Sequence, residues 1–402
     1  MNSHRIYTLV YIFTTFPPEV SGSAHFNWER VQWFAKQGMY RIIVLAPDCQ
    51  NQSSLPSVPA DLQDSLIIET YPSKPWLLYK LLHVPKFSAA DQIRERLAHY
   101  KPDLITVVDI ERLFWFSTWH LPGISYARKH NIPYITEYHT DYYGHVSTYP
   151  AGKLAREIFL KPLNRYLYRQ CDLAIAVSAA SSVGLQQIGI SDFHTISMYG
   201  IDVYAYSPER RNRKCLEPWL TQREQEHKVL IFLGRLAFEK RLDILIEAFA
   251  KLKRTQDKCS LLIVGDGPVD VVQKFKHLAE SIPDIHFTGF LDGEIKANVM
   301  ASCDVYCSPS PYETFGRSVV EAMASGIPVL TVNSGGVCDY IIDGVNGYLV
   351  APNDVEEFAN GIQKVLSNNN TGIIQQALLD ANQCSTDRGC EKLNNYYQHL
   401  LK

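Results

Sequence analysis

The feature that most constrains the fold of this chain is a regular alternation of short apolar segments with longer amphipathic ones. Runs typical of buried strands occur at 6–15, 41–47, 66–71, 104–108, 132–139, 171–178, 228–234, 260–265, 285–290, 305–310 and 327–332. Helical periodicity marks segments at 25–38, 88–99, 241–254, 268–281, 293–302, 317–325 and 354–367. This β–α–β alternation predicts parallel sheets that carry helices on both faces.

The length of the chain, 402 residues, is too great for one ordinary hydrophobic core and predicts two domains. A polar stretch without apolar periodicity, 205–227, is the expected boundary between them. We therefore predict an α/β protein with two Rossmann-like, doubly wound domains, 1–205 and 206–385, followed by a last helix at 386–402. Ligands of such folds bind beyond the carboxyl ends of the strands, so the expected site lies between the two domains.

Composition excludes several classes of function. A net charge of −3 gives no overall positive field to attract nucleic acid. The nine cysteines show no metal-ligand spacing, and their odd number argues against a secreted disulfide framework. Cys303 and Cys307 lie on an apolar segment and are expected to be buried thiols. The apolar N-terminal segment is interpreted as a first strand and not a signal peptide, which favours a cytoplasmic location.

Two carboxylates mark the segment SPSPYETFGRSVVEAMASG at 308–326. Glu313 and Glu321 are eight positions apart, a little over two helical turns, and a helix is expected to begin near Arg317 or Ser318. If Glu313 precedes that helix and Glu321 lies inside it, both can face one ligand, and the first amides of the helix favour a phosphate. On these residues alone, a solvated helix face remains the stronger interpretation.

Further segments favour a ligand-binding role for the two glutamates. The glutamate spacing resembles the glutamate-x7-glutamate motif of retaining, nucleotide-sugar-dependent glycosyltransferases with the GT-B fold (glycosyltransferase family four). Four more segments are similar to blocks of that family and stand in the same order: FLGRLAFEKRLDILIEAF at 232–249, LLIVGDGP at 261–268, FTGFL at 287–291 and SGGVCDYIIDGVNGYLV at 334–350. The combination is specific, whereas any one block alone is weak.

The resemblance implies an activity as well as a fold. It implies transfer of a hexose from a UDP- or GDP-sugar to a hydroxyl of a glycolipid, saccharide or small molecule, with retention, by a front-face mechanism and without metal or other cofactor. Residues 1–205 then form the acceptor-side domain, 206–385 bind the nucleotide sugar, and the helix at 386–402 crosses back to the first domain. A nucleotide-sugar epimerase or hydrolase, or a non-catalytic nucleotide-sugar-binding protein, remains the alternative.

The diphosphate of the donor needs positive charge or amide dipoles as it departs. Arg235 and Lys240 follow a predicted strand directly, and Gly234 lets the backbone turn there. The resemblance implies that this arginine and lysine stabilise the leaving diphosphate. On residue type alone, a pair of solvated loop cations is more frequent. The neighbouring Arg241 is expected to be a surface residue.

The remaining donor contacts also come from the resemblance. Glu313 is expected to contact the donor sugar, and Glu321 the ribose hydroxyls. The residues implied to lie against the diphosphate or the nucleobase are Thr314, Phe315, Gly316, Phe290 and Leu291. Arg317 departs from the apolar residue usual at its position in that family, and contact with a phosphate or an acidic donor sugar is as open as exposure to solvent.

In the first domain, Gly22 and Ser23 are expected in the loop between the first strand and the first helix, with amides near the diphosphate. His139 ends a predicted strand and resembles the histidine that lines the sugar site of this family. A lone histidine at a strand end is more often structural, so this role depends on the resemblance.

The acceptor side is less defined. Residues 153–169 interleave five cations with apolar side chains, which suits either a helix packed on its domain or one that lies on an anionic membrane. Pro162 is expected to kink or divide this helix. Peripheral contact with the inner face of a membrane is therefore a further option. Aromatic residues at 115, 116, 119, 142 and 143 suit an acceptor site or a core.

Overall fold

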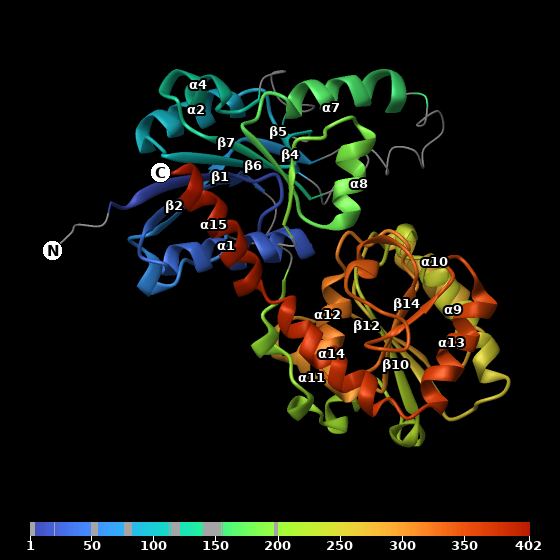
Figure 1. Cartoon of the computed structure of the whole chain (residues 1–402). Coiled ribbons are helices and arrows are strands. Elements are labelled where there is room, and N and C mark those ends of the chain that lie inside the picture. The colour runs from blue at the N-terminus through green and yellow to red at the C-terminus, as the bar shows by residue number, and fades with distance from the viewer. Residues whose placement is uncertain are drawn as a thin grey trace. The chain divides into compact units, whose positions relative to one another are not determined.

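The structure is a computed structural model, and it describes residues 5–19, 21–49, 55–75, 83–111, 113, 121–139, 154, 156–196 and 200–402. The chain forms two compact units, the first made of Met1–Tyr199 with Thr386–Lys402 and the second of Gly200–Ser385 (Figure 1). The aromatic positions 115, 116, 119, 142 and 143 lie outside the described residues. Among the described helices, none is long and apolar enough to cross a membrane.

The first unit is built on a parallel sheet of seven strands in the order β3-β2-β1-β6-β7-β8-β9. The strands are β1 (Tyr7–Ile12), β2 (Tyr40–Pro47), β3 (Leu66–Tyr71), β6 (Leu104–Val108), β7 (Tyr134–Tyr138), β8 (Leu173–Ala176) and β9 (His194–Thr195). Its helices are α1 (Gly22–Lys36), α2 (Ala89–Tyr100), α4 (Ile124–His130), α7 (Lys161–Tyr168) and α8 (Ala179–Gln187). The strand order reverses between β1 and β6, which marks the switch point where ligands of such sheets bind.

Helix α1 begins earlier than the sequence suggested. Ser21 is its N-cap, and the Ser21 hydroxyl accepts a hydrogen bond from the amide of Ala24 at 3.2 Å. The expectation that Gly22 and Ser23 lie in a loop is therefore wrong, because this cap makes them the first two helical residues. Their amides still belong to the N-terminal turn of a helix, the part of a helix that favours anions.

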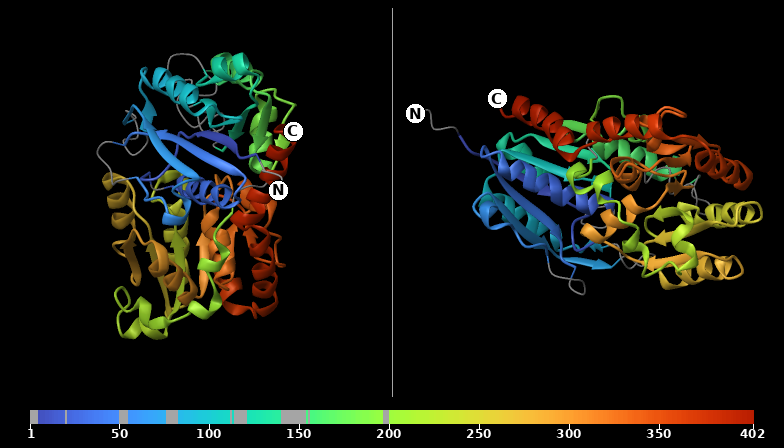
Figure 2. Two further views of the ribbon diagram at one scale, coloured as in Figure 1. Left: turned by 90° about the vertical axis from the view of Figure 1, so that its left-hand side faces the viewer. Right: turned by 90° about the horizontal axis from the view of Figure 1, so that it is seen from below.

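The last helix, α15 (Thr386–Leu400), belongs to the first unit and packs beside α1 (Figure 2). Tyr397 of α15 is fully buried, with its ring 5.3 Å from that of Phe34 in α1. Its hydroxyl group lies 3.1 Å from that of Thr106 in β6, and Tyr40 in β2 bonds to Asn394 at 2.6 Å. The end of the chain is therefore an integral part of the first core.

The second unit is built on a parallel sheet of six strands in the order β12-β11-β10-β13-β14-β15. The strands are β10 (Lys228–Leu233), β11 (Cys259–Val264), β12 (Ile285–Gly289), β13 (Val305–Ser308), β14 (Val329–Val332) and β15 (Tyr348–Val350). The helices are α9 (Leu242–Lys253), α10 (Val269–Ala279), α11 (Gly293–Ser302), α12 (Arg317–Ala324), α13 (Val355–Ser367) and α14 (Thr371–Gln383). Helices α9 and α13 cover one face of the sheet, and α11, α12 and α14 the other (Figure 1).

The polar stretch expected as a boundary, 205–227, is not an open linker. It contains short 3-10 helices at Pro208–Arg210, Arg213–Leu216 and Arg223–Glu226, and it counts with the second unit. Arg211 and Arg213 fasten it to Asp304, at 2.7 and 3.0 Å. Ion pairs therefore hold residues 205–227 in place, and hydrophobic periodicity could not predict them.

The expected strands and helices are largely confirmed in the described residues, and so is the fold class. Strand β15 and helix α14 lie beyond the segments that the alternation identified. Cys303 and Cys307 are buried as expected, and burial raises the pKa of both thiols. All nine cysteines lie in the described part of the chain, and all are reduced thiols.

Candidate active site

The centre of the candidate site is an ion pair at the switch point of the second sheet. Strands β10 and β13 are neighbours in that sheet, and the order of the strands reverses between them. Lys240 lies on the loop after β10 and Glu313 on the loop after β13. The Nζ of Lys240 lies 2.6 Å from Oε1 of Glu313, and their side chains are 21% and 14% exposed. The structure thus brings together two of the residues proposed from sequence.

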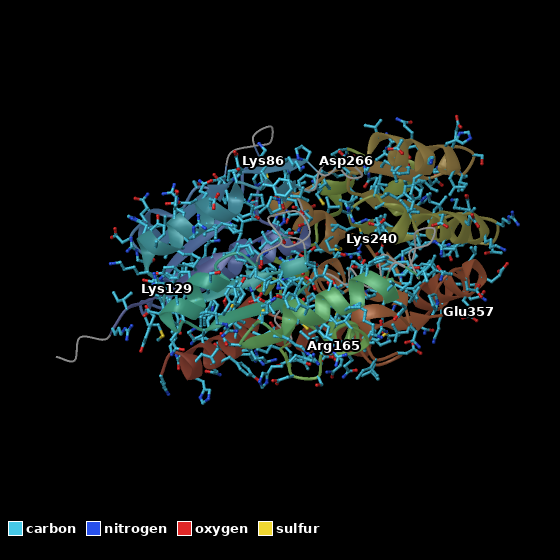
Figure 3. The ribbon with its side chains drawn as sticks, turned by 90° about the horizontal axis from the view of Figure 1, so that it is seen from above. Lys86, Lys129, Arg165, Lys240, Asp266 and Glu357 are labelled. Atoms are coloured by element: carbon cyan, nitrogen blue, oxygen red, sulfur yellow. The ribbon has the colours of Figure 1, made fainter. Side chains whose placement is uncertain are left out.

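The first of these loops carries a second cation. Arg235 follows β10 after Gly234, and its guanidinium bonds to Glu239 at 2.6 Å. The side chain of Arg235 is 40% exposed, more than that of Lys240. Figure 3 labels Lys240 together with Asp266, which lies on the next loop, after β11. Both cations at this edge are therefore paired with carboxylates of the chain itself.

Two glycines allow the loops after β10 and β11 to run against each other. A Cβ at Gly265 would lie 1.9 Å from the carbonyl oxygen of Gly234, and one at Gly267 would lie 2.1 Å from that of Leu236. The amide of Leu236 also donates to the carbonyl of Asp266 at 2.9 Å. Any larger side chain at Gly265 or Gly267 would push the loop of Arg235 away.

A second pair of glycines fixes the loop that carries Glu313. The amide of Gly336 donates to the Glu313 carbonyl at 2.6 Å, and a Cβ on Gly336 would lie 2.0 Å from the carbonyl oxygen of Thr314. The hydroxyl of Tyr340 donates to the carbonyl of Phe315 at 2.6 Å. The backbone around Glu313 is thus held from the loop after β14.

Helix α12 begins at Arg317, as expected, with Glu313 before it and Glu321 inside it. Gly316 precedes the helix with φ +82°, a left-handed conformation that favours glycine. Glu321 is 4% exposed, and its Oε1 lies 3.2 Å from Nζ of Lys296 in α11. Each glutamate of the motif therefore has a lysine of its own.

Arg317, for which the sequence left both a phosphate and solvent open, has a partner inside the second unit. Its guanidinium donates to the carbonyl of Gly200 at 2.5 Å, so it is directed to the first residue of the second unit and not simply to solvent. Phe290, expected beside the nucleobase, follows β12 and is 51% exposed. Leu291 next to it is partly exposed. Both thus lie at the carboxyl edge of the sheet, as the loops of Lys240 and Glu313 do.

In the first unit, His139 follows β7 and belongs to a buried ionic network. Its Nε2 lies 2.8 Å from Oε2 of Glu137, which is 2.6 Å from a guanidinium nitrogen of Arg30 in α1. All three side chains are 0% exposed. Because an ionised carboxylate only accepts, Nε2 of His139 carries the hydrogen. The ring is therefore oriented from inside the unit, and in this structure it is closed to solvent.

Aromatic rings surround the charge of Arg30. Its guanidinium carbon lies 5.0 Å from the ring centroid of Tyr11, 4.9 Å from that of Phe13 and 5.5 Å from that of Phe26. Burial by itself would raise the pKa of Glu137, but the charge of Arg30 and the hydrogen bond from His139 lower it below its ordinary value. Glu137 is thus an ionised carboxylate inside the first core.

The basic segment of the first unit is divided as expected at Pro162. A π-helical turn, Arg156–Leu160, precedes α7, and Pro162 lies in the first turn of α7. The buried side of α7 packs into the core, whereas several large apolar side chains point outward. These are Leu154, Ile158, Phe159 and Tyr166, exposed by 65%, 54%, 67% and 61%. Arg165, labelled in Figure 3, and Arg169 are exposed beside them. The outer side of this segment therefore carries both apolar side chains and cations.

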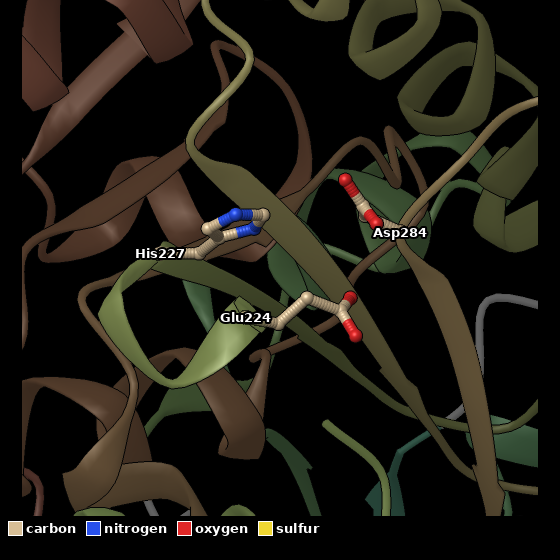
Figure 4. A group of neighbouring side chains, drawn as sticks. All are labelled: Glu224, His227 and Asp284. Carbon is tan, nitrogen blue, oxygen red and sulfur yellow. The ribbon is translucent and has the colours of Figure 1, made fainter. Parts of the chain in front are cut away.

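One group of side chains among the described residues could hold a metal ion, and it lies away from the loops after β10 and β13. Single ligand atoms of Glu224, His227 and Asp284 all fall within 4.8 Å of one another (Figure 4). Glu224 and His227 precede β10, and Asp284 precedes β12, so the group lies at the amino edge of the sheet. Asp284 is already paired with Arg223 and, at 2.7 Å, with Lys253. These partners fit a structural cluster better than a metal centre.

Sequence reasoning missed the residues that hold the site residues in place. Each of these residues contacts a predicted site residue or its backbone: Arg30, Glu137, Lys296 and Tyr340. Only Tyr340 belongs to one of the segments that carried the resemblance. A signal for Lys296 existed, since it stands on a helix next to α12 and its charge opposes that of Glu321. For Arg30 and Glu137 no local signal exists, because they are 107 positions apart.

Comparison with known proteins covers both units. A model described as "Glycosyltransferase Family 4" matches residues 20–203, and one described as "Glycosyl transferases group 1" matches residues 218–378. A GDP-mannose-dependent alpha-mannosyltransferase of Corynebacterium glutamicum is 34% identical over 68% of this chain and 60% of the relative. Its counterpart from Mycolicibacterium smegmatis is 28% identical over 86% of this chain and 84% of the relative. The chain thus spans well under two thirds of the first relative and most of the second.

Solved structures share the fold across both units. Anabaena HepE, solved with UDP and glucose, aligns with a TM-score of 0.74 at 21% identity over 98% of this chain and 100% of its own. The sucrose-phosphate synthase of Thermosynechococcus elongatus aligns with a TM-score of 0.77 at 17% identity over 98% and 99%. The two doubly wound parallel-sheet units of this chain have the GT-B fold of these structures. Within that class, the chain belongs to glycosyltransferase family four.

Proposed function

We propose that this enzyme transfers a hexose from a UDP- or GDP-sugar to a hydroxyl acceptor with retention at the anomeric carbon. The observation that carries the proposal is the Lys240–Glu313 pair at the switch point of the second sheet, 2.6 Å apart. It joins the cation expected at the diphosphate to the carboxylate expected at the sugar. The bond that must break lies between those two groups of the donor.

The proposed reaction uses Arg235 and Lys240 for the departing charge. The bond between the anomeric carbon and the phosphate oxygen breaks, and the acceptor oxygen bonds to that carbon from the same face. The proton of the acceptor hydroxyl passes to the departing phosphate oxygen. Both cations face carboxylates in the free enzyme, so we propose that the diphosphate replaces a carboxylate as the partner of each cation.

The proposed donor chemistry needs no divalent metal, because two protein cations supply the charge that a metal would otherwise supply. The test is transfer activity after dialysis against EDTA, which we expect to remain within twofold of the untreated value. Activity that disappears and returns with Mg²⁺ or Mn²⁺ would contradict metal independence and leave the transferase assignment intact.

GDP-mannose is the first donor to test, because two relatives that align with this chain are GDP-mannose-dependent mannosyltransferases. A thermal-shift series with GDP, UDP and their sugars identifies the base, since a ligand that binds only the native state raises Tm. Transfer of labelled sugar to an acceptor panel then tests the reaction. Turnover without acceptor would favour an epimerase or hydrolase, and binding without any transfer would favour a non-catalytic protein.

For the acceptor, we propose a glycolipid presented at an anionic membrane surface. Support comes from the outward-facing Ile158, Phe159 and Tyr166 with the exposed cations Arg165 and Arg169. Apolar side chains of this kind insert at the headgroup boundary, and the cations favour anionic lipid.

Sedimentation with vesicles tests this membrane proposal. We expect wild-type protein to sediment with phosphatidylglycerol vesicles and to remain in solution with phosphatidylcholine vesicles. Changing Phe159→Ser together with Tyr166→Ser should abolish sedimentation. The matched control is Leu379→Ser in the second unit, a similarly exposed leucine on α14, a helix whose sequence contains no lysine or arginine, and it should behave as wild type. Equal sedimentation of all three proteins would contradict the proposal.

A further inference from the structure

Glu321 is the carboxylate of the motif that is nearly closed to solvent. It lies in the middle of α12 and is 4% exposed, whereas the side chain of Glu313 is 14% exposed. A buried carboxylate is costly unless a cation or several donors compensate it. The compensating cation is Lys296, whose Nζ lies 3.2 Å from Oε1 of Glu321.

Lys296 is itself held from more than one side. Its ammonium group lies 5.5 Å from the centroid of the Tyr206 ring, and its side chain is only 18% exposed. The helix that carries it, α11, is fastened near its middle, where Arg210 donates to the Asn298 side chain at 3.2 Å. Lys296 is therefore a fixed cation and not a mobile surface lysine.

We propose that Lys296 is a positioning residue that makes the enzyme selective for ribonucleotide donors. The inference rests on the proposed function, in which Glu321 binds the ribose hydroxyls. Lys296 holds Oε1 of Glu321 at 3.2 Å, and an ionised carboxylate can only accept hydrogen bonds. With Oε1 anchored on Lys296, the carboxylate is oriented to receive both ribose hydroxyls, and a 2′-deoxyribose offers one hydroxyl fewer.

Three substitutions separate this role from general stability. Lys296→Met keeps the length of the side chain and removes its charge, whereas Lys296→Arg keeps the charge. The matched control is Lys276→Met in α10, because Lys276 also lies over an aromatic ring, that of Phe287 at 5.9 Å. Tm of each variant confirms that the second unit is folded.

The measurement is the Kd of GDP and UDP and of their 2′-deoxy counterparts, by calorimetry. For the base that the enzyme binds, we expect wild type to prefer the ribonucleotide by about 10–100-fold, as for a hydrogen bond to a charged group. Lys296→Met should reduce this preference to less than about threefold, by weakening only the ribonucleotide. Lys296→Arg and Lys276→Met should keep it.

The outcomes distinguish this inference from the proposed function. If Glu321→Ala loses the ribose preference but Lys296→Met keeps it, only the role of Lys296 is wrong. Equal weakening of ribo- and deoxyribonucleotides by Lys296→Met also overturns the inference, because Lys296 then acts elsewhere on the nucleotide. If Glu321→Ala keeps the preference, the ribose role of Glu321 is wrong and the role of Lys296 is wrong with it.

Discussion

Two ionic networks lie at the carboxyl edges of the two sheets, and they differ in how far they are closed to solvent. In the first unit, Arg30, Glu137 and His139 form a chain of contacts whose side chains are all 0% exposed. In the second unit, the side chains of Lys240 and Glu313 are 21% and 14% exposed. The first network is closed to solvent, whereas the second is partly exposed to it.

The difference distinguishes charges that hold the fold from charges that we propose act on a substrate. A buried pair contributes through the cost of leaving either partner alone, so its energetic effect is on unfolding. A partly exposed pair contributes little to unfolding, but its cation can exchange a carboxylate for a phosphate. Removing the cation is therefore expected to lower stability in the first network and turnover in the second.

The largest expected effect is on the stability of the first unit. Arg30→Met should lower the free energy of unfolding by about 3–5 kcal/mol, because it leaves the charge of Glu137 inside the core with no cation beside it except the ring of His139. Denaturant unfolding measures the loss. Adding Glu137→Gln to Arg30→Met removes the isolated charge and should recover much of it. A double variant no more stable than Arg30→Met would show that the loss of stability comes from lost packing of the Arg30 side chain and not from the charge of Glu137.

The next effect is on turnover, at the second network. Lys240→Ala should lower kcat by about 100–1,000-fold, because the departing diphosphate loses a charge partner, while Tm changes little. The matched control, Lys258→Ala, removes an exposed lysine just before β11, at the opposite edge of the same sheet, and should leave kcat within twofold. Unchanged turnover in Lys240→Ala would refute the assignment of the site.

Most of the fold and part of the site could be predicted from the sequence, for a physical reason. A strand buried on both faces is a continuous apolar run in the sequence, so β10, β11, β13 and β14 could be located from such runs. The loops after β10 and β13 hold Arg235, Lys240 and Glu313 close to those strands in sequence. The topology of the sheet then brings the loops together, as the 2.6 Å Lys240–Glu313 contact shows.

What could not be predicted depends on contacts between distant segments. Arg30 reaches Glu137 across 107 positions, and Arg317 reaches Gly200 across 117. Neither contact leaves a periodic pattern in the sequence. The start of α1 was missed because the Ser21 cap adds Gly22 and Ser23 to the helix before its apolar periodicity begins. The roles of the site residues in catalysis stay predictions.

A smaller effect on stability is expected at Glu224, a buried carboxylate at the amino edge of the second sheet. It is 1% exposed and accepts from the Thr221 amide at 2.8 Å, from Ser260 at 3.1 Å and from His286 at 2.6 Å. Glu224→Gln should lower the free energy of unfolding by about 1–3 kcal/mol and leave kcat unchanged. A fall in kcat at equal folded fraction would contradict a purely structural role.

The same residue gives a pH test with a defined sign. Burial alone would raise the pKa of Glu224, but hydrogen bonds from Thr221 and His286 lower it from 4.5 to about 2. A folded pKa below the unfolded one stabilises the protein above about pH 4.5, and this contribution is lost as the pH falls toward 2. The difference in unfolding free energy between wild type and Glu224→Gln should therefore shrink over that interval. A difference independent of pH would show that the ionised form is not what Glu224 contributes.

The smallest expected effect is at Arg241, directly beside Lys240. Arg241 has φ +50°, and its guanidinium pairs with Asp243 at 3.0 Å and also bonds to Asn353. Arg241→Gly relieves a left-handed backbone worth about 1–2 kcal/mol, and it removes a partly exposed ion pair worth about 0.2–1 kcal/mol. Glycine also costs about 0.5–1 kcal/mol of backbone entropy on folding, so the free energy of unfolding should change by less than about 1 kcal/mol in all, with kcat within twofold of wild type. Denaturant unfolding and initial rates measure both, and a loss of turnover like that of Lys240→Ala would show that the local positive field matters more than the cation that contacts Glu313.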